Sequence, residues 1–294
     1  MKLGIAYVPT LPPERLRELA TVAENSGLDE LWVWEDCFKQ SAIASAAAAL
    51  AMTSTIPVGI GLLPAPLRNV ALTAMEFATL ERMFPGRLIA GVGHGVQDWM
   101  RQVGAQVASP LTLLEEYTTA LRRLLAGEQV TVDGRYVQLD AVQLDWPPVV
   151  PPPLVLGGAG PKTLSLAGRL GDGVLLGTAL SDDVVRQSCA TVAAARAGSG
   201  PDRTAPDSTA TPITATQIVA TGPGAQQRLD RELPFWDQSA GSGIGVAGDA
   251  AAVAASLRRW ADAGITTVVI QPTRDEPDLP GLLRFLGQQV RPLL

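Results

Sequence analysis

The sequence predicts an α/β protein in which eight parallel strands close into a (β/α)8 TIM barrel. The first observation is that short apolar segments alternate with helical patterns along the chain, which implies parallel strands joined by crossover helices. The second is that eight such segments can be counted, which favours a closed barrel over an open sheet. The third is the length of 294 residues, 47% of them hydrophobic, which suits one barrel. We therefore expect a single domain, 1–294, with insertions after strands 4, 6 and 7.

The expected strands are short apolar runs bounded by glycine, proline or polar residues. The eight expected strands are residues 3–8, 31–34, 57–63, 88–92, 154–156, 173–176, 213–220 and 265–271. Glycines interrupt the third of them and end the fourth, where the backbone can approach another chain segment or a ligand closely.

The expected helices show apolar residues at a spacing of three and four, with proline and acids at the start and glycine after the end. The first opens at Pro12-Pro13-Glu14 and closes at Gly27, and residues 70–83 place Leu72, Met75, Thr79 and Leu80 on one face. The others span 42–52, 111–125, 162–170, 183–196, 249–263 and 279–290.

The insertions have distinct compositions. Residues 130–139 contain Asp133-Gly134, a strong hairpin signal. Residues 198–212 are rich in Gly, Pro, Ser, Thr and Asp, which predicts a mobile surface loop. Residues 222–248 show no clear pattern and are expected to be irregular.

Composition excludes several classes of protein. The net charge of −6 and the lack of a basic run argue against nucleic acid as a partner. No apolar run approaches the ~18 residues of a membrane span, and no signal peptide is visible, so we expect a cytoplasmic protein. One histidine and two separated cysteines, Cys37 and Cys189, cannot build a zinc site or a disulfide framework. A Mg²⁺ ion held by Glu35 and Asp36 is disfavoured, because adjacent residues at a strand end point in opposite directions.

In a barrel the chemistry belongs to the loops that follow the carboxyl ends of the strands. Here these loops are 35–40, 61–66, 93–99, 157–161, 177–178, 222–248 and 271–274. Gly157-Gly158-Ala159-Gly160 at a strand-to-helix junction offers backbone N–H groups and a positive helix end, and Gly177-Thr178 follows the next strand. This pair suits a phosphate group, and the alternative is an ordinary turn.

Few side chains in these loops can carry chemistry alone. No lysine lies late on a barrel strand, which argues against a Schiff-base enzyme. Cys37 follows two carboxylates that oppose thiolate formation, so a packing role is favoured over a nucleophile. His94, the single histidine, lies in the glycine loop 91–95, where it either donates a hydrogen bond or a proton or has a structural role.

Two segments resemble the bacterial luciferase-like superfamily of flavin- and deazaflavin-dependent oxidoreductases. The first is Arg68-Asn69 with the helix 71–83 and the stretch 85–95, and the second is 158–168 followed by Asp172-Gly173. Gly264-Ile265 is similar to the start of the last strand of the family. The resemblance covers the chain except for 198–243.

The glycine loop resembles that of members using the deazaflavin F420, notably the methylenetetrahydromethanopterin reductase-like branch. The resemblance implies that the cofactor ring lies at the barrel mouth, backed by a non-prolyl cis peptide near Gly61-Leu62, with its phosphate at the loops after strands five and six. It assigns cofactor binding to Gly61, Leu62, Gly93, His94, Gly158, Ala159, Gly160, Pro161, Gly177 and Thr178, and catalysis to Asp36, Cys37 and His94.

Two positions depart from the pattern of that family. Cys37 stands where several relatives carry a catalytic histidine, and Val96 stands where some carry a glutamate acid. These departures argue against a sugar-phosphate dehydrogenase and suit a reductase in which water or His94 supplies the proton. Arg68, Arg101 and Lys162 are candidate cations for the polyanionic cofactor tail.

We therefore expect an oxidoreductase that transfers hydride between F420 and a small organic substrate, acting as a homodimer. The alternatives are an FMN-dependent luciferase-like monooxygenase and a flavin- or deazaflavin-binding protein without turnover.

Overall fold

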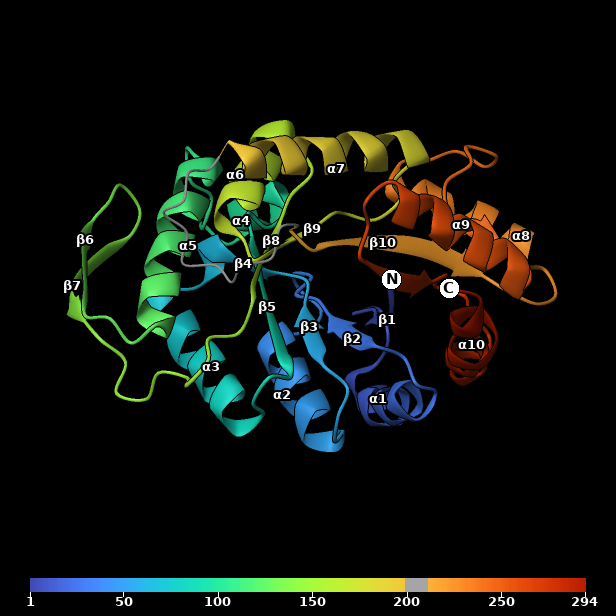
Figure 1. Ribbon diagram of the computed structural model, residues 1–294, viewed down its shortest axis with the longest axis horizontal. Coiled ribbons are helices and arrows are strands. Elements are labelled where there is room, and N and C mark those ends of the chain that lie inside the picture. The colour runs from blue at the N-terminus through green and yellow to red at the C-terminus, as the bar shows by residue number, and fades with distance from the viewer. Residues whose placement is uncertain (199–210) are drawn as a thin grey trace.

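The computed structural model describes residues 1–198 and 211–294, and within them eight parallel strands form a closed barrel (Figure 1). The ring closes because β1 pairs with β12 and β9 pairs with β10, so the predicted fold class is confirmed. Its strands are β1 (Lys2–Tyr7), β2 (Glu30–Val33), β3 (Val58–Ile60), β5 (Leu88–Gly93), β8 (Leu154–Gly157), β9 (Gly173–Leu175), β10 (Ile213–Ala220) and β12 (Thr267–Pro272).

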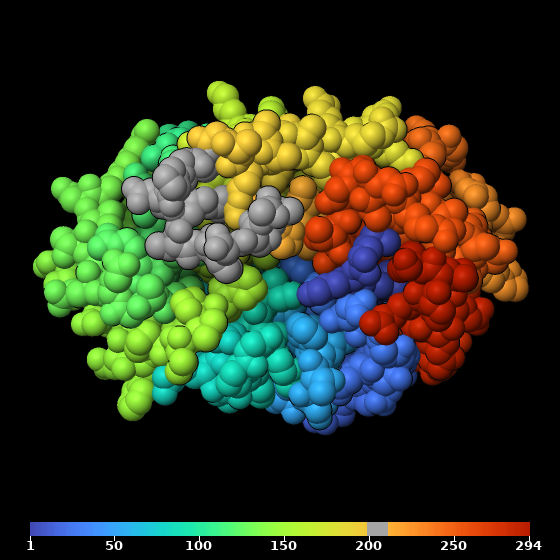
Figure 2. Space-filling model, in the orientation of Figure 1, coloured from blue at the N-terminus to red at the C-terminus, as the bar shows by residue number. Residues whose placement is uncertain are grey.

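Helices form a layer around the barrel (Figure 1). Side chains at the N-caps satisfy free N–H groups of several of them, among them Ser41, Asn69, Ser109 and Asp249. The helices are α1 (Leu16–Asn25, after the 3-10 turn Pro13–Arg15), α2 (Ala42–Met52), α3 (Val70–Met83), α5 (Pro110–Leu125), α6 (Pro161–Leu170), α7 (Asp182–Ala197), α9 (Ala250–Asp262) and α10 (Leu279–Phe285, continued as a π turn, Leu286–Val290, and a 3-10 turn, Arg291–Leu293). The N-terminal residues lie against the C-terminal segments in Figure 2, as the pairing of β1 with β12 requires.

The expectation that 222–248 is irregular was wrong. This insertion contains α8 (Ala225–Glu232), a 3-10 turn (Leu233–Trp236) and β11 (Val246–Ala247), which extends the sheet beside the end of β10. Ala225, Leu229 and Leu233 recur every four residues and are buried, so the helical signal was present in the sequence. A short helix, α4 (Gln97–Gln102), also occupies part of the expected loop 93–99. Most of the predicted mobile loop, 199–210, lies outside the described residues.

The predicted hairpin is present as β6 (Val130–Asp133) and β7 (Gln138–Val142), but its turn differs from the two-residue type that Asp133-Gly134 favours. Asp133 pairs with Gln138, which leaves four residues in the loop. The carboxylate of Glu116 on α5 accepts the N–H groups of three of them, residues 135–137, at 2.8–3.0 Å. This tertiary contact selects the longer loop.

Of the four residues predicted to share one face of α3, Leu72, Met75 and Thr79 are exposed to solvent, whereas Leu80 is buried in the core. Leu72 is 46% exposed and Met75 is 57% exposed, whereas Phe77 on the opposite side is fully buried in the core. This helix therefore leaves an apolar stripe uncovered.

Inward-pointing side chains fill the middle of the barrel, and a cavity of about 550 Å³ lies at the amino ends of its strands, lined by Glu30 and Trp32 among others. Glu30 and Trp32 alternate along β2 and point inward, and the Trp32 indole donates to the Glu30 carboxylate at 2.9 Å. A Cβ atom at Gly59 would lie 2.4 Å from the Trp32 ring, so the glycine in β3 makes room for the indole.

The third strand breaks where its glycines predict a break. β3 ends at Ile60, and the chain resumes as β4 (Leu63–Pro64), which pairs with β5. The intervening Gly61–Leu62 peptide bond is cis, as the family resemblance implies, and Cys37–Phe38 is a second non-prolyl cis bond.

Candidate active site

A cavity of about 400 Å³ opens at the carboxyl ends of the barrel strands. Its size falls in the range of small-molecule sites. The walls come from the loops after β2, β3, β5, β8, β9, β10 and β12, so segments that are far apart in sequence meet there.

Most of the residues predicted for the site line this cavity: Asp36, Gly61, Leu62, His94, Gly158, Ala159, Gly177 and Thr178. Gly93 is not part of the lining, but it contacts the lining residue Leu62. Gly160 and Pro161 begin α6 next to Ala159, on the exposed side, and Cys37 lies outside the lining.

The side chain of Leu62 explains why two glycines of neighbouring strands meet here. Gly93 and Gly157 are register partners in β5 and β8. A Cβ atom at Gly93 would lie 2.5 Å from a Leu62 methyl group, and one at Gly157 would lie 2.1 Å from it. Only glycine at both positions leaves room for Leu62, which forms part of the cavity floor.

The loop between β8 and α6 has the properties of an anion site. Among the described residues, no acceptor is found for the N–H groups of Ala159, Gly160, Lys162 and Thr163. These groups lie at the positive end of α6, where a phosphate is stabilised. The Lys162 side chain is exposed and has no ion-pair partner in the described part of the chain.

Space for a bound group is also present at this loop. A Cβ atom at Gly160 or at Gly177 would meet nothing within 4 Å. Gly177 lines the cavity directly, so its bare Cα leaves part of the cavity open. The residues present therefore fit a phosphate-bearing cofactor.

His94 connects two of the site loops. Its Nδ1 lies 3.1 Å from the Pro110 carbonyl oxygen, which can only accept, so Nδ1 carries the proton in the neutral ring. Nε2 then accepts the hydroxyl proton of Thr163 at 2.9 Å. Burial lowers the pKa of His94 and favours this neutral form. With both nitrogens engaged, the geometry favours a positioning role; the predicted proton donation stays a prediction.

The acidic loop after β2 is tightly held. Arg68 pairs with Glu35 through both terminal nitrogens and lies 3.2 Å from Glu76 through Nε. Glu35 also accepts the N–H of Ala42 at the start of α2. Arg68 is thereby committed to two carboxylates, which argues against its predicted role at the cofactor tail.

Asp36 and Cys37, the two residues that follow Glu35, differ in how available they are for chemistry. Asp36 lines the cavity, and its Oδ2 atom lies 3.3 Å from Lys39 Nζ, which leaves Oδ1 without a described partner. Burial raises the pKa of the Cys37 thiol, and the charges of Glu35 and Asp36 add to this effect. Cys37 is therefore a neutral thiol, which disfavours a nucleophile. Its predicted catalytic role stays a prediction.

Several residues that line the cavity were not predicted from the sequence. Trp34, Trp99 and Trp236 form aromatic walls, and Thr216 and Gln271 add polar groups beside Thr178. Trp34 continues the inward alternation of Trp32 on β2, so its direction could have been inferred. Trp236 belongs to the insertion that was expected to be irregular, and it had no such signal.

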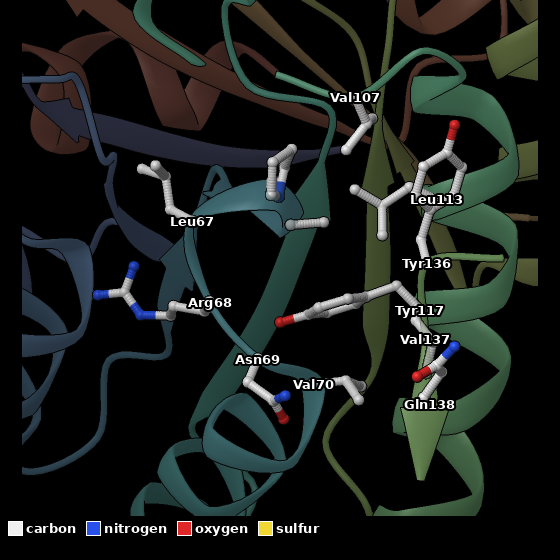
Figure 3. Close-up of a pocket in the computed structure, with 12 residues that line it drawn as sticks. Leu67, Arg68, Asn69, Val70, Val107, Leu113, Tyr117, Tyr136, Val137 and Gln138 are labelled. Carbon is white, nitrogen blue, oxygen red and sulfur yellow. The ribbon is translucent and has the colours of Figure 1, made fainter. Parts of the chain in front are cut away.

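Another cavity, of about 310 Å³, lies outside the barrel between the start of α3, α5 and the hairpin. In Figure 3 the ring of Tyr117 extends into it from α5, whereas the Arg68 guanidinium points away toward its carboxylate partners. Burial raises the pKa of Tyr117 to about 12, and its hydroxyl donates to Thr73. This cavity therefore presents no free charge from these two residues.

No described helix has the length and apolar character needed to cross a bilayer. No group of three or more His, Cys, Asp or Glu side chains within residues 1–198 and 211–294 could hold a metal ion.

Comparison with known proteins gives consistent matches. The family model of the luciferase-like monooxygenases matches residues 3–264. The 5,10-methylenetetrahydromethanopterin reductase of Methanolobus tindarius is 34% identical over 205 residues, 68% of this chain and 62% of the reductase. An F420-dependent glucose-6-phosphate dehydrogenase of Kineococcus radiotolerans is 32% identical over 60% of this chain and 56% of the dehydrogenase. The chain thus spans about three fifths of the length of these curated relatives.

Solved structures show the same fold over the whole chain. An F420-dependent secondary alcohol dehydrogenase, bound to an F420-acetone adduct, has a TM-score of 0.85 at 23% identity and full coverage of both chains. The coenzyme F420 dependent tetrahydromethanopterin reductase of Methanopyrus kandleri has a TM-score of 0.85 at 20% identity, covering 99% of this chain and 98% of the reductase.

Proposed function

Because the chain belongs to the luciferase-like monooxygenase family, we propose that it is an oxidoreductase that uses F420 to transfer hydride to or from a small organic molecule. The observation that carries this proposal is the set of unpaired N–H groups at the start of α6, beside a cavity at the barrel mouth and next to Lys162. Relatives named for F420 support the choice of cofactor.

When bound, a reduced deazaflavin supplies a hydride, and a proton from another group completes the reduction of the substrate. The N–H groups of Ala159, Gly160, Lys162 and Thr163 and the Lys162 side chain would hold the phosphate, and Gly177 would leave room for the cofactor. Leu62, seated on Gly93 and Gly157, gives the cavity a rigid apolar floor on which a flat ring can pack. Apart from the exposed Lys162 side chain, these contacts would be made by the backbone or by packed side chains, which would orient the cofactor without rearrangement.

Asp36 is the best-placed group for proton exchange with a substrate. Its carboxylate lines the cavity and keeps Oδ1 available, whereas Glu35 is held by Arg68 and by the N–H of Ala42. His94 would instead fix the glycine loop of β5 to α6 through Thr163. The alternative proton source is water. A comparison of the reaction rates of Asp36→Asn and the wild type distinguishes the two sources, because the rate falls only if Asp36 supplies the proton.

Parallel fluorescence titrations of the purified protein with F420 and with FMN test this proposal. We expect saturable F420 binding in the micromolar range or tighter, and weaker FMN binding. Micromolar FMN binding without measurable F420 binding would overturn the cofactor assignment and favour the monooxygenase alternative. Binding of F420 without any hydride transfer to a panel of electron-poor alkenes and ketones would favour the non-catalytic alternative.

We further propose that the protein acts as a homodimer in the cytoplasm. The exposed apolar stripe of α3, with Leu72 and Met75, supports self-association. The two cysteines of the chain are both free, which suits a reducing compartment.

A further inference from the structure

Three tryptophans line the cavity, and two of them, Trp34 and Trp236, follow strands that do not neighbour β8 in the barrel. Trp34 at the end of β2, Trp99 on α4 and Trp236 in the insertion after β10 all line it, together with the apolar residues Pro64 and Val96. Three of the six tryptophans of the chain thus converge on one cavity. Aromatic walls of this kind bury flat apolar ligands and contribute through stacking.

The two cations of the described chain that lie next to Glu35 and Asp36 are already paired. Lys39 lies 3.3 Å from Asp36, Arg68 is held between Glu35 and Glu76, and no Lys or Arg of the described residues lines the cavity itself. Two carboxylates, Glu35 and Asp36, are part of the lining. An anionic ligand group placed here would lose its hydration without gaining an unpaired cation.

Trp236 is fixed by a buried carboxylate. The side chain of Glu232 is 2% exposed and accepts the Trp236 indole N–H at 3.0 Å. The other carboxylate oxygen accepts the backbone N–H of Arg274 at 2.9 Å, and the Arg274 guanidinium lies 3.4 Å from Glu232 and stacks on Phe235. Glu232 thereby binds the insertion to the loop after β12 and satisfies the charge of Arg274.

The α6 loop and the tryptophan walls thus differ in electrostatic character. At the α6 loop, N–H groups without described partners and the unpaired Lys162 favour an anion. At the tryptophan walls, the cations Lys39, Arg68 and Arg274 are paired with carboxylates. The polyanionic part of a cofactor suits the α6 loop, and a ligand without negative charge suits the tryptophan walls.

We propose that the substrate of this protein is an aromatic or alicyclic molecule that carries no negative charge, and that Trp236, positioned by Glu232, is a specificity-determining residue. This inference rests on the proposed function, because it assumes that the phosphate of the cofactor is bound at the α6 loop. It distinguishes this chain from a sugar-phosphate enzyme, because a phosphate at the tryptophan walls would meet two carboxylates and no free cation.

Calorimetric titration with four probes tests the substrate class, both without F420 and with F420 at saturation. The probes are benzylideneacetone, which is neutral, cinnamylamine, which is cationic, cinnamate, which shares their styryl skeleton but is anionic, and glucose 6-phosphate. We expect cinnamate to bind at least about tenfold more weakly than benzylideneacetone, and glucose 6-phosphate not to bind. Equal or tighter binding of cinnamate or glucose 6-phosphate would overturn the proposal.

Variants locate the effect at Trp236. Trp236→Ala should weaken benzylideneacetone binding about fivefold or more, Trp236→Phe should retain most of it, and Glu232→Gln should fall between them. Trp146→Ala is the matched control, because Trp146 is 71% exposed and contacts Arg82 instead of the cavity. Unchanged probe binding in Trp236→Ala would exclude Trp236 as the determinant.

The two proposals fail separately in this design. If F420 does not bind but cinnamate still binds more weakly than benzylideneacetone, the cofactor assignment is refuted and the proposed substrate class stands. Tight F420 binding with a preference for anionic probes would refute the ligand class alone. The probe series on the wild-type protein needs no variant to fold, so the test stands even if Trp236→Ala is unstable.

Discussion

At the scale of single residues, burial and hydrogen bonding decide what a titratable group can do. His94 has the chemistry of a general acid, but Pro110 and Thr163 occupy both of its nitrogens and burial lowers its pKa. The residue type suggested proton transfer, and its surroundings favour a fixed, neutral link between β5 and α6. Asp36, which is less constrained, is better suited to exchange a proton.

The lowered pKa of His94 predicts a pH-dependent contribution to stability. Above about 6.5 the ring is neutral in both states and its contribution is fully present. As the pH falls below that value, the unfolded chain takes up a proton that the folded site resists, so the contribution is lost as the pH passes through the folded pKa. The free-energy difference between the wild type and His94→Gln should therefore be largest at pH 7–8 and shrink toward pH 5.

Urea denaturation of both proteins at pH 8, 7, 6 and 5 measures this difference. A difference that stays constant or grows on acidification would show that His94 is not held neutral in the folded state.

At the scale of elements, glycines mark the places where strands and loops approach something bulky. Gly59 makes room for Trp32, whereas Gly93 and Gly157 make room for Leu62. Gly160 differs from these, since a side chain there would project into open space. The first group serves packing, and Gly160 is available for ligand approach.

Substitution of Gly59 by Ala should destabilise the barrel by about 1–3 kcal/mol, because its Cβ would lie 2.4 Å from the Trp32 ring. The cost should be smaller in a Trp32→Phe background, in which part of the indole is removed. Gly177→Ala is the control for stability, since its Cβ would meet no atom within 4 Å. Additive free energies of unfolding in the double variant would contradict this explanation.

Substitution of Gly160 by Val should leave the fold intact, because the residue has an extended backbone (φ −78°, ψ 150°) and an unobstructed Cβ direction. The branched side chain would obstruct the unpaired N–H groups, so F420 affinity should fall about tenfold or more, with Gly160→Ala intermediate. Fluorescence titration measures the affinity, and circular dichroism checks the fold. Unchanged affinity in a folded Gly160→Val protein would count against a phosphate at this loop.

At the scale of the whole molecule, the barrel brings loops from seven strands to one cavity and leaves one outer helix face apolar. The exposed stripe on α3 has no cover within the described part of the chain. A second copy of the chain that packs on this stripe would bury Leu72 and Met75.

If the α3 stripe forms the dimer interface, Met75→Glu should shift the protein from dimer to monomer in sedimentation velocity, because it places a charge in a buried apolar contact. Val184→Glu is a control, since Val184 is 43% exposed and lies on α7, which packs against α6 and α9 and not against α3. A wild-type protein that is monomeric at micromolar concentration, or a Met75→Glu protein that stays dimeric, would refute this interface.

The sequence by itself determined the closed barrel, its eight strands and the glycine loops that meet at the cavity, whereas the cis peptide at Gly61-Leu62 was implied by the family resemblance. The strands and the glycine loops follow from local patterns: apolar runs, caps and glycines act within a few residues along the chain. It did not determine that Trp34, Trp99 and Trp236 share one cavity, or that Arg68 is held by Glu35 and Glu76. Those facts depend on contacts between residues that are distant in sequence, and only the tertiary structure decides which charges are neutralised and which N–H groups stay free. The ligand chemistry of the site is set by that balance of paired and unpaired groups.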